Sequence, residues 1–357
     1  MSRTRQFAKR CATAGLAVVV AFALGACGSG STGAADAARS GSQSQATADS
    51  GLTGGVQISG DQYPLSITDF VGHAITLDHK PERVCVISGT PLNIWYDIGG
   101  TAVCGPSVSE NTRLVAEHAA EISSLPEVGQ TYAVNIEALV AQQPDLVVSM
   151  VGPQDSQLPR IREVGLQTVS VKVRTFDELA TTYRLFGSII GSTDLAEQRI
   201  AEIAARRDAV LAQWPGGDIP VVILYVTAQA LSVKLDNSIA GSMSQTLGLT
   251  NIASGLMPDN PGSETTPLSI EEIVRQQPDY VLVTSMISTN ELARDTLDAE
   301  FARNQAWQAV DAVREGRVIY LPQQYFLYNA GPYYAEALEY LAASLRPDIF
   351  GEPVLTE

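Results

Sequence analysis

Two acidic side chains, Glu137 and Glu271, occupy the same place in two copies of one sequence pattern. The copies are Asn135–Ser149 and Ser269–Val283, and their residues match at a constant offset of 134 positions (271 minus 137). In each copy a cap residue precedes Ile, Leu and Val at helical spacing, and Pro-Asp then ends the helix before an apolar run. The pattern predicts a unit of a helix, a tight turn and a buried parallel strand, and this unit occurs twice in the chain.

The repeat predicts two similar lobes that carry the two carboxylates at equivalent places. In open α/β sheets, ligands bind in the crevice at the carboxyl ends of the strands, and the following helix begins on that side. Glu137 and Glu271 are therefore expected on the cleft-side face of each lobe. A carboxylate in a first turn also complements the helix dipole, and Ser269 with Glu272 fits a capping box. The residues alone leave both interpretations open.

Cys27 closes a short segment that is typical of export signals. Basic residues within the first ten positions precede an apolar run at about 14–24, which is too short for an ordinary membrane span. The run ends in Leu-Gly-Ala-Cys27, which resembles the bacterial lipobox and implies that Cys27 carries a lipid. We predict a lipoprotein signal peptide over residues 1–27 and a flexible tether, rich in Gly, Ser and Ala, over residues 28–62.

The rest of the chain predicts an α/β protein of two doubly wound, Rossmann-like lobes joined by one long backbone helix. We place the N-terminal lobe at 63–175, the connecting helices at 176–213, the C-terminal lobe at 214–349 and a tail at 350–357. The helix at 193–213 is expected to be the single crossing between the lobes. Besides the repeated units, residues 63–77 alternate like an antiparallel hairpin, strands are expected at 84–87, 168–171, 220–226 and 318–321, and helices at 91–98, 158–164, 175–190, 193–213, 241–248, 304–313 and 332–345.

The composition argues against several classes of function. The net charge of −16, from 23 basic and 39 acidic residues, argues against nucleic acid or an anionic lipid surface as the main partner. The three histidines, His73, His79 and His118, are too few and too scattered for a receptor of bare zinc or manganese. Because the sequence carries no phosphate-binding loop, nucleophile elbow or zinc-protease motif, it does not predict an enzyme.

Cys85 and Cys104 are the two cysteines of the predicted folded body. They fall in successive apolar runs that are typical of neighbouring strands. In an oxidising compartment such a pair forms a disulfide, and two buried thiols in a sheet core fit the pattern equally well. Neither interpretation makes them catalytic.

Several motifs together resemble the class III (cluster A) substrate-binding lipoproteins of ABC importers. They are the lipobox, the segment Pro81-Glu-Arg-Val, the paired units, the long helix and the terminal helix that begins at Gly331-Pro332, and the resemblance covers about 63–349. It implies a receptor for iron–siderophores, haem or cobalamin. Glu137 and Glu271 match the two positions at which members of this family dock into arginine pockets of the two permease subunits.

The resemblance also implies where the protein works and with what. We expect a monomer held by Cys27 on the outer face of the plasma membrane, with the ABC permease dimer and its ATPase as partners and no intrinsic cofactor. The favoured ligand is a ferric siderophore, and haem or cobalamin is the alternative. An enzyme or an adhesion or sensor lipoprotein is the less favoured class.

Loops at the strand ends of both lobes are expected to line the ligand site, because aromatic and methionine side chains form an adaptable apolar wall. Tyr132 is a candidate axial ligand for haem, and Lys172 with Arg174 is expected to attract an anionic ferric chelate. The expected ligand-binding residues are Ser88, Thr90, Gln130, Tyr132, Met150, Lys172, Arg174, Tyr225, Met243, Met286, Tyr325 and Tyr328.

Overall fold

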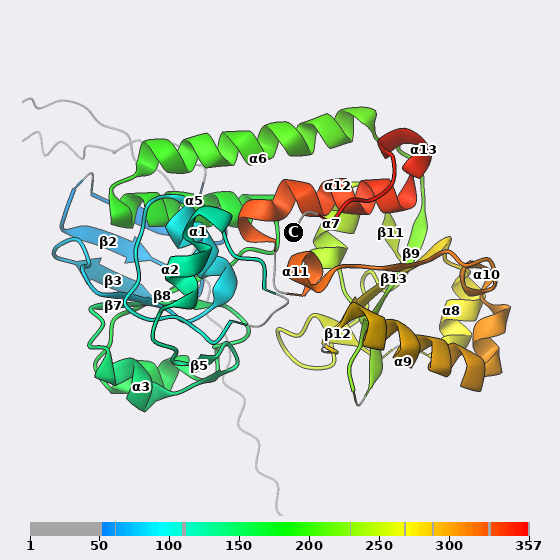
Figure 1. Cartoon of the computed structure of the whole chain (residues 1–357), viewed down its shortest axis with the longest axis horizontal. Coiled ribbons are helices and arrows are strands. Elements are labelled where there is room, and N and C mark those ends of the chain that lie inside the picture. Colours follow the sequence, from blue (N-terminus) through cyan, green and yellow to red (C-terminus); the bar gives the residue numbers. More distant parts are fainter. Residues whose placement is uncertain are drawn as a thin grey trace, which may run out of the picture. The chain divides into compact units, whose positions relative to one another are not determined.

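A computed structural model describes residues 52–60, 62–108, 112–228, 230–267, 269–287, 289–327 and 330–355 of the chain, except the side chain of Asn290 (Figure 1). The predicted signal peptide, Cys27 and most of the predicted tether lie outside the described residues, as does Tyr328. Within the described part, no helix combines the length and the apolar character that crossing a membrane requires.

The N-terminal lobe is built on a parallel sheet of β4 (Val84–Val86), β7 (Leu146–Met150) and β8 (Thr168–Val171), in the order β4-β7-β8. These strands are covered on both faces, which explains their unbroken apolar sequences. The predicted hairpin is present as β2 (Leu65–Thr68) and β3 (Ala74–Leu77), and β1 (Gln57–Ser59) extends it. The buried Asp69 ties this small antiparallel sheet to β8, because its Oδ2 accepts a hydrogen bond from the Ser170 amide at 2.9 Å.

Helices and short turns complete this lobe. They are α1 (Gly89–Asp97), η1 (Ala116–His118), α2 (Ala119–Ser123), the two-residue strands β5 (Gly129–Gln130) and β6 (Ala133–Val134), α3 (Ile136–Ala141) and α4 (Leu158–Glu163). The predicted strand at Cys104 is reduced to a single parallel bridge with Cys85.

The two connecting helices begin and end where the sequence predicts. α5 (Phe176–Ile190) begins with Thr175, whose hydroxyl accepts a hydrogen bond from the Glu178 amide, and it ends at Gly191, which has a left-handed backbone (φ 79°). α6 (Thr193–Gln213) then runs along both lobes (Figure 1). The cap and the C-terminal glycine fix the ends of α5 locally, so the sequence alone locates them. At α6 the predicted cap is not formed, because Thr193 is the first helical residue and Ser192, at the N-cap position, makes no side-chain cap hydrogen bond.

The C-terminal lobe contains a mixed sheet rather than a second fully parallel one. Its strands are β9 (Pro220–Val226), β10 (Leu231–Lys234), β11 (Thr250–Asn251), β12 (Thr265–Thr266), β13 (Tyr280–Ser285) and β14 (Val318–Tyr320). β13 and β14 run parallel to β9. At the other edge, β10 pairs antiparallel with β9, and β12 pairs antiparallel with β10. The expectation of one motif used twice missed these two strands. Only residues 227–230 separate β9 from β10, and so short a connection permits only an antiparallel return.

The helices of this lobe are α7 (Ile239–Thr246), α8 (Ile270–Gln276), α9 (Asn290–Arg303), η2 (Gln305–Ala309), α10 (Asp311–Arg314), α11 (Gln323–Phe326), η3 (Gly331–Tyr333), α12 (Tyr334–Leu345) and α13 (Pro347–Phe350). The sequence did not predict α9. Its buried apolar side chains are Ala293, Leu297 and Phe301 in an otherwise polar sequence, so its helical pattern is weak.

α6 is not the only link between the lobes, because the chain returns to the N-terminal lobe near its end. The Tyr333 hydroxyl donates a hydrogen bond to the Leu114 carbonyl at 2.9 Å, and η3 packs against α1. α12 packs along α6 at the centre of the molecule (Figure 1). One continuous apolar core includes Val148 of β7, Leu282 of β13 and Leu338 of α12. The lobes therefore share a core in addition to a connecting helix.

Because the core is shared, we predict that both lobes unfold together. Leu338→Ala should lower the free energy of unfolding by about 2–5 kcal/mol, since Leu338 is fully buried. Urea unfolding followed in single-tryptophan variants that retain Trp95 in the N-terminal lobe or Trp307 in the C-terminal lobe should give coincident transitions, each shifted equally by the substitution. Leu292→Ala, at a side chain that is 48% exposed, is the control and should leave the midpoint unchanged. Two separate midpoints would contradict the shared core.

Candidate functional site

The duplicated unit has the same local structure in both lobes. Asn135 and Ser269 cap α3 and α8, and their side-chain oxygens accept hydrogen bonds from the amides of Ala138 (3.1 Å) and Glu272 (3.2 Å). Each helix is followed by a glutamine with a left-handed backbone, Gln143 (φ 50°) and Gln277 (φ 46°), again 134 positions apart (277 minus 143). The chain then enters β7 or β13. The backbone thus confirms the repeat that the sequence predicts.

Glu137 and Glu271 are both exposed in the first turns of α3 and α8. Neither carboxylate has a hydrogen bond or an ion pair with another described residue. The neighbouring Glu272 differs, because it pairs with Arg275, and this contact lowers the pKa of the Glu272 carboxyl. The predicted capping box is therefore half formed: Ser269 caps the helix, but the Glu272 carboxylate bonds to Arg275 and Gln276. Glu137 and Glu271 remain available for an external cation.

A cavity of about 440 Å³ lies where the ends of the strands of both lobes meet. The N-terminal lobe supplies the turn between β4 and α1, the segment after Gly105, the turn between β5 and β6, and the end of β7. The C-terminal lobe supplies Met286, directly after β13, and Leu327, directly after α11. The lining residues are Ser88, Gly89, Thr90, Pro106, Ser107, Val108, Thr112, Gln130, Thr131, Tyr132, Met150, Pro153, Met286 and Leu327.

Six of the expected ligand-binding residues line this cavity, and these are Ser88, Thr90, Gln130, Tyr132, Met150 and Met286. Met150 is the last residue of β7, Met286 directly follows β13, and Ser88 and Thr90 lie where β4 leads into α1, as the rule for open α/β sheets predicts. Gln130 and Tyr132 lie at the turn between β5 and β6. The sequence did not single out Pro106, Thr112 or Pro153, because loop residues carry no periodic signal and only the folded chain brings them to the cavity.

The chemical character of the lining is apolar with neutral polar groups. Among its described residues none is charged, and hydroxyls, one side-chain amide and two thioethers supply the polar and polarisable atoms. Tyr132 is 60% exposed and Met286 is 52% exposed, so both side chains lie at the open rim. Within the described residues, no cluster of His, Cys, Asp and Glu could hold a metal ion directly.

Met243 and Tyr325 do not lie in the cavity. Both are fully buried in the shared core, where Met243 lies on the inner face of α7. The Tyr325 hydroxyl accepts a hydrogen bond from Arg113 at 3.0 Å and donates one to Glu336 at 3.2 Å. Their assignment to the ligand was therefore wrong: the fold uses both as packing residues.

Lys172, Arg174 and Tyr225 also lie outside the cavity lining. Arg174, which follows β8, forms an ion pair across the lobes with Glu264 (2.7 Å), and Lys234 of β10 approaches the other oxygen of Glu264 at 3.2 Å. The Lys234 ammonium lies 4.3 Å from the Tyr225 ring centre, and the Tyr225 hydroxyl donates to the Met286 sulfur at 3.1 Å. Arg174 therefore pairs with a protein carboxylate that it shares with Lys234, and its attraction for an anionic chelate stays a prediction.

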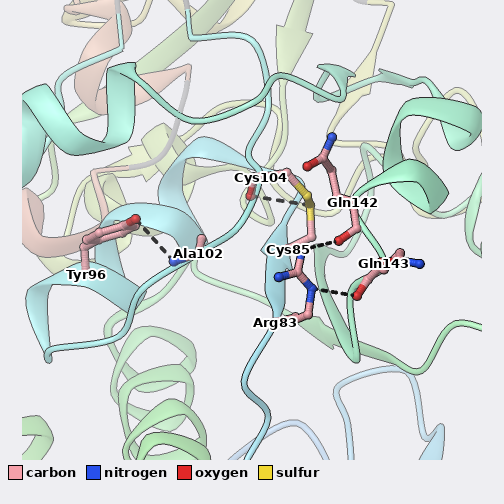
Figure 2. Close-up of a disulfide and its surroundings, with 7 residues drawn as sticks. All are labelled: Arg83, Cys85, Tyr96, Ala102, Cys104, Gln142 and Gln143. Carbon is pink, nitrogen blue, oxygen red and sulfur yellow. Dashed lines mark hydrogen bonds between the residues drawn. A yellow bond between two sulfur atoms is a disulfide. The ribbon is translucent and has the colours of Figure 1, made fainter.

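Cys85 and Cys104 form a disulfide, which resolves the alternative left open by the sequence (Figure 2). Both residues are fully buried, and the bond joins β4 to the segment that leads into the cavity wall at Pro106. Next to it, Arg83 donates hydrogen bonds to the carbonyls of Gln142 (2.6 Å) and Gln143 (3.1 Å) at the end of α3 (Figure 2). A cation at a helix C-terminus satisfies its last carbonyl groups.

Comparison with known proteins agrees with this geometry. A family model described as "Periplasmic binding protein" matches residues 84–325, and the chain belongs to that family. Members of the family are substrate-binding proteins of ABC transporters rather than enzymes, and they work outside the cytoplasm.

Individual relatives are more distant. A protein of Halobacterium salinarum named cobalamin-binding protein is 28% identical over 222 residues, which is 62% of this chain and 58% of that protein's length. An uncharacterized ABC transporter substrate-binding lipoprotein of Bacillus subtilis is 20% identical over 300 residues, 81% of this chain and 88% of its own length. A crystal structure from Saccharomonospora viridis, titled as an ABC-type Fe³⁺-hydroxamate transport system, is 20% identical with a TM-score of 0.66. The match covers 80% of this chain and 99% of the chain in that structure.

We predict that the contact between Arg174 and Glu264 stabilises the closed arrangement of the lobes. The side chains of Arg174 and Glu264 are only 18% and 26% exposed, so Glu264→Gln should leave Arg174 and Lys234 poorly compensated and lower the free energy of unfolding by about 1–3 kcal/mol. Urea unfolding of the whole protein measures this difference. Glu197→Gln, at the more exposed ion pair with Arg184, is the control and should change it by less than about 1 kcal/mol. Equal effects of the two substitutions would contradict the assignment.

Proposed function

We propose that this protein captures a bulky metal chelate of low net charge between its lobes and delivers it to an ABC importer. The observation that carries the proposal is the cavity at the facing strand ends. Both lobes contribute to its wall, and its described lining is uncharged. A ligand enclosed by such a wall has to bring little charge of its own, because a desolvated charge without a partner is costly.

The lining favours a neutral ferric hydroxamate siderophore over more highly charged ligands. A ferric tricatecholate and the propionates of haem are anionic and need cationic side chains at the site. Arg174 lies outside the lining and already pairs with Glu264. Ser88, Thr90 and Gln130 offer neutral hydrogen bonds, and the methionines offer a polarisable surface that adapts to a bulky ligand.

Cobalamin is the second candidate. It is supported by the name of the relatives from Halobacterium salinarum and by the same lack of charge in the described lining. A corrinoid also presents a large apolar face with amide groups at its edge, which suits thioethers and hydroxyls. Haem is less well supported, because Tyr132 lies at the open rim rather than enclosed beside a cation.

Delivery is proposed to use Glu137 and Glu271. Both are exposed, lack a partner among the described residues and stand at equivalent places of the repeated unit. Two equivalent carboxylates can dock one receptor in a defined orientation on a permease that has two-fold symmetry, and arginine is a suitable partner for each. In this proposal Cys27 carries the lipid anchor and residues 28–51 form the tether that keeps the receptor near its permease. The tether is shorter than the sequence predicts, because β1 already belongs to the folded body and the Thr53 amide donates a hydrogen bond to Thr181.

The shared core limits the motion that accompanies capture and release. α6, α12 and η3 all connect the lobes, so ligand binding is expected to bring only modest closure, with local adjustment of Tyr132 and Met286 at the rim. Release then requires the permease to separate the strand ends and break the contact between Arg174 and Glu264.

We predict that Glu137→Arg combined with Glu271→Arg abolishes uptake of the ligand by whole cells and leaves binding by the purified receptor unchanged. The reason is that the new arginines would repel the proposed arginine pockets. Uptake of labelled ligand and isothermal titration calorimetry measure the two quantities. Glu163→Arg combined with Glu291→Arg makes the same change of charge at exposed sites outside the repeat and should leave both unchanged. Loss of ligand binding in the first variant would refute the docking role.

We also predict a ranking of ligands by charge. A neutral ferric trihydroxamate or cyanocobalamin should bind at least about tenfold more tightly than a ferric tricatecholate or haemin, a difference of about 1.4 kcal/mol. Met286→Asp should weaken the binding of the neutral ligands, because it adds a carboxylate to a lining without cations among its described residues. Calorimetry on the purified receptor provides the measurement. Tightest binding of the anionic tricatecholate would overturn the proposed ligand class.

A further inference from the structure

We propose that two buried glutamines, Gln154 and Gln323, are positioning residues that hold the wall of the ligand cavity, one in each lobe. Neither contacts the cavity, and each bonds to backbone groups of the segments that line it. The inference deepens the function proposed above, and its affinity measurement rests on that function.

Gln154 joins three segments of the N-terminal wall. Its side chain is fully buried, its Oε1 accepts a hydrogen bond from the Met150 amide at 2.7 Å, and its Nε2 donates to the carbonyls of Thr131 (2.5 Å) and Ile87 (3.3 Å). Met150 and Thr131 line the cavity, and Ile87 directly precedes Ser88, which also lines it. A side-chain amide is the uncharged group that accepts and donates twice at once, so no other residue of this length satisfies all three segments.

Gln323 serves the opposite wall. It is 4% exposed at the start of α11, and its Nε2 donates a hydrogen bond to the Ile287 carbonyl. Ile287 directly follows Met286, and α11 leads directly into Leu327, so Gln323 connects the two residues that the C-terminal lobe contributes to the described lining. In each lobe a glutamine therefore fixes a methionine that faces the cavity.

These bonds determine the geometry of the wall because they replace regular secondary structure there. The lining residues lie mainly in turns, which lack the ladder of hydrogen bonds that holds a strand. Without the Gln154 amide, two carbonyls and one amide would lose a partner in a buried place, and the segments would move to find others. If these segments are already ordered before the ligand binds, binding costs less conformational entropy.

Gln154→Glu is the sharpest test, because it retains the acceptor for the Met150 amide and removes the two N–H donors. The ionised carboxylate of this variant would face two carbonyl groups, whereas its protonated form regains one donor, and burial raises the pKa of such a carboxyl. The ligand is the neutral ferric trihydroxamate or the cyanocobalamin that binds the wild-type protein. We expect its Kd to rise about tenfold at pH 8 in this variant and to recover partly at pH 5.

Gln157→Glu is the matched control. Gln157 lies in the same turn, its Oε1 accepts from the Val134 amide at 2.7 Å, and its Nε2 has no partner among the described residues, so the substitution removes no hydrogen bond. Its Kd should follow the wild type within about twofold at both pH values. A pH dependence confined to Gln154→Glu separates positioning from a general loss of stability.

Hydrogen–deuterium exchange of the unliganded full-length protein at pH 8 tests the inference without a ligand. Segments 86–90 and 130–134 should exchange faster in Gln154→Glu than in Gln157→Glu. Segment 285–288 should likewise exchange faster in Gln323→Glu than in Gln157→Glu. Gln323→Glu is the second test variant if Gln154→Glu does not fold. If the wild type binds neither neutral probe, the proposed function fails while this exchange measurement still decides the positioning role. Exchange and Kd within twofold of the wild type in Gln154→Glu and Gln323→Glu would overturn the inference.

Discussion

The apolar core shared by both lobes is the constraint on which the rest of the structure depends. Side chains from β7, β13, α6 and α12 pack into one cluster that spans both lobes, in addition to a smaller apolar cluster within each lobe. Because packed interiors resist deformation, the distance between the two rows of strand ends is set largely by this core. The cavity between them is consequently a property of the whole body rather than of either lobe.

This constraint assigns different roles to the residues around the cavity. Uncharged side chains line it, the disulfide and Arg83 secure the segments behind the N-terminal wall, and the ion pair of Arg174 with Glu264 lies beside it across the lobes. The charged side chains named here thus pair with other groups of the protein, and the described lining of the cavity is neutral.

Features with a local cause were largely predictable. The ends of α5 follow from Thr175 and Gly191, and the repeated unit follows from its caps and its Pro-Asp stop. The strand-end location of the site followed from topology, which placed Ser88, Met150 and Met286 at the cavity. α9 and β10 were missed, because a weakly amphipathic helix and a short edge strand take their stability from neighbours that the sequence does not display.

Residue type alone misassigned side chains whose partners are distant in sequence. Tyr325 and Arg113 are 212 positions apart, and only folding turns the tyrosine into a buried hydrogen-bonding group. Arg174 and Glu264 likewise meet across the lobes. By itself the sequence determined the duplicated α/β unit, its two outward carboxylates and the edge of the sheets at which the cavity lies, because caps, periodicity and strand direction act over a few residues. Tertiary structure alone decided which side chains face the cavity and which are neutralised or buried, because burial and pairing depend on contacts between remote parts of the chain.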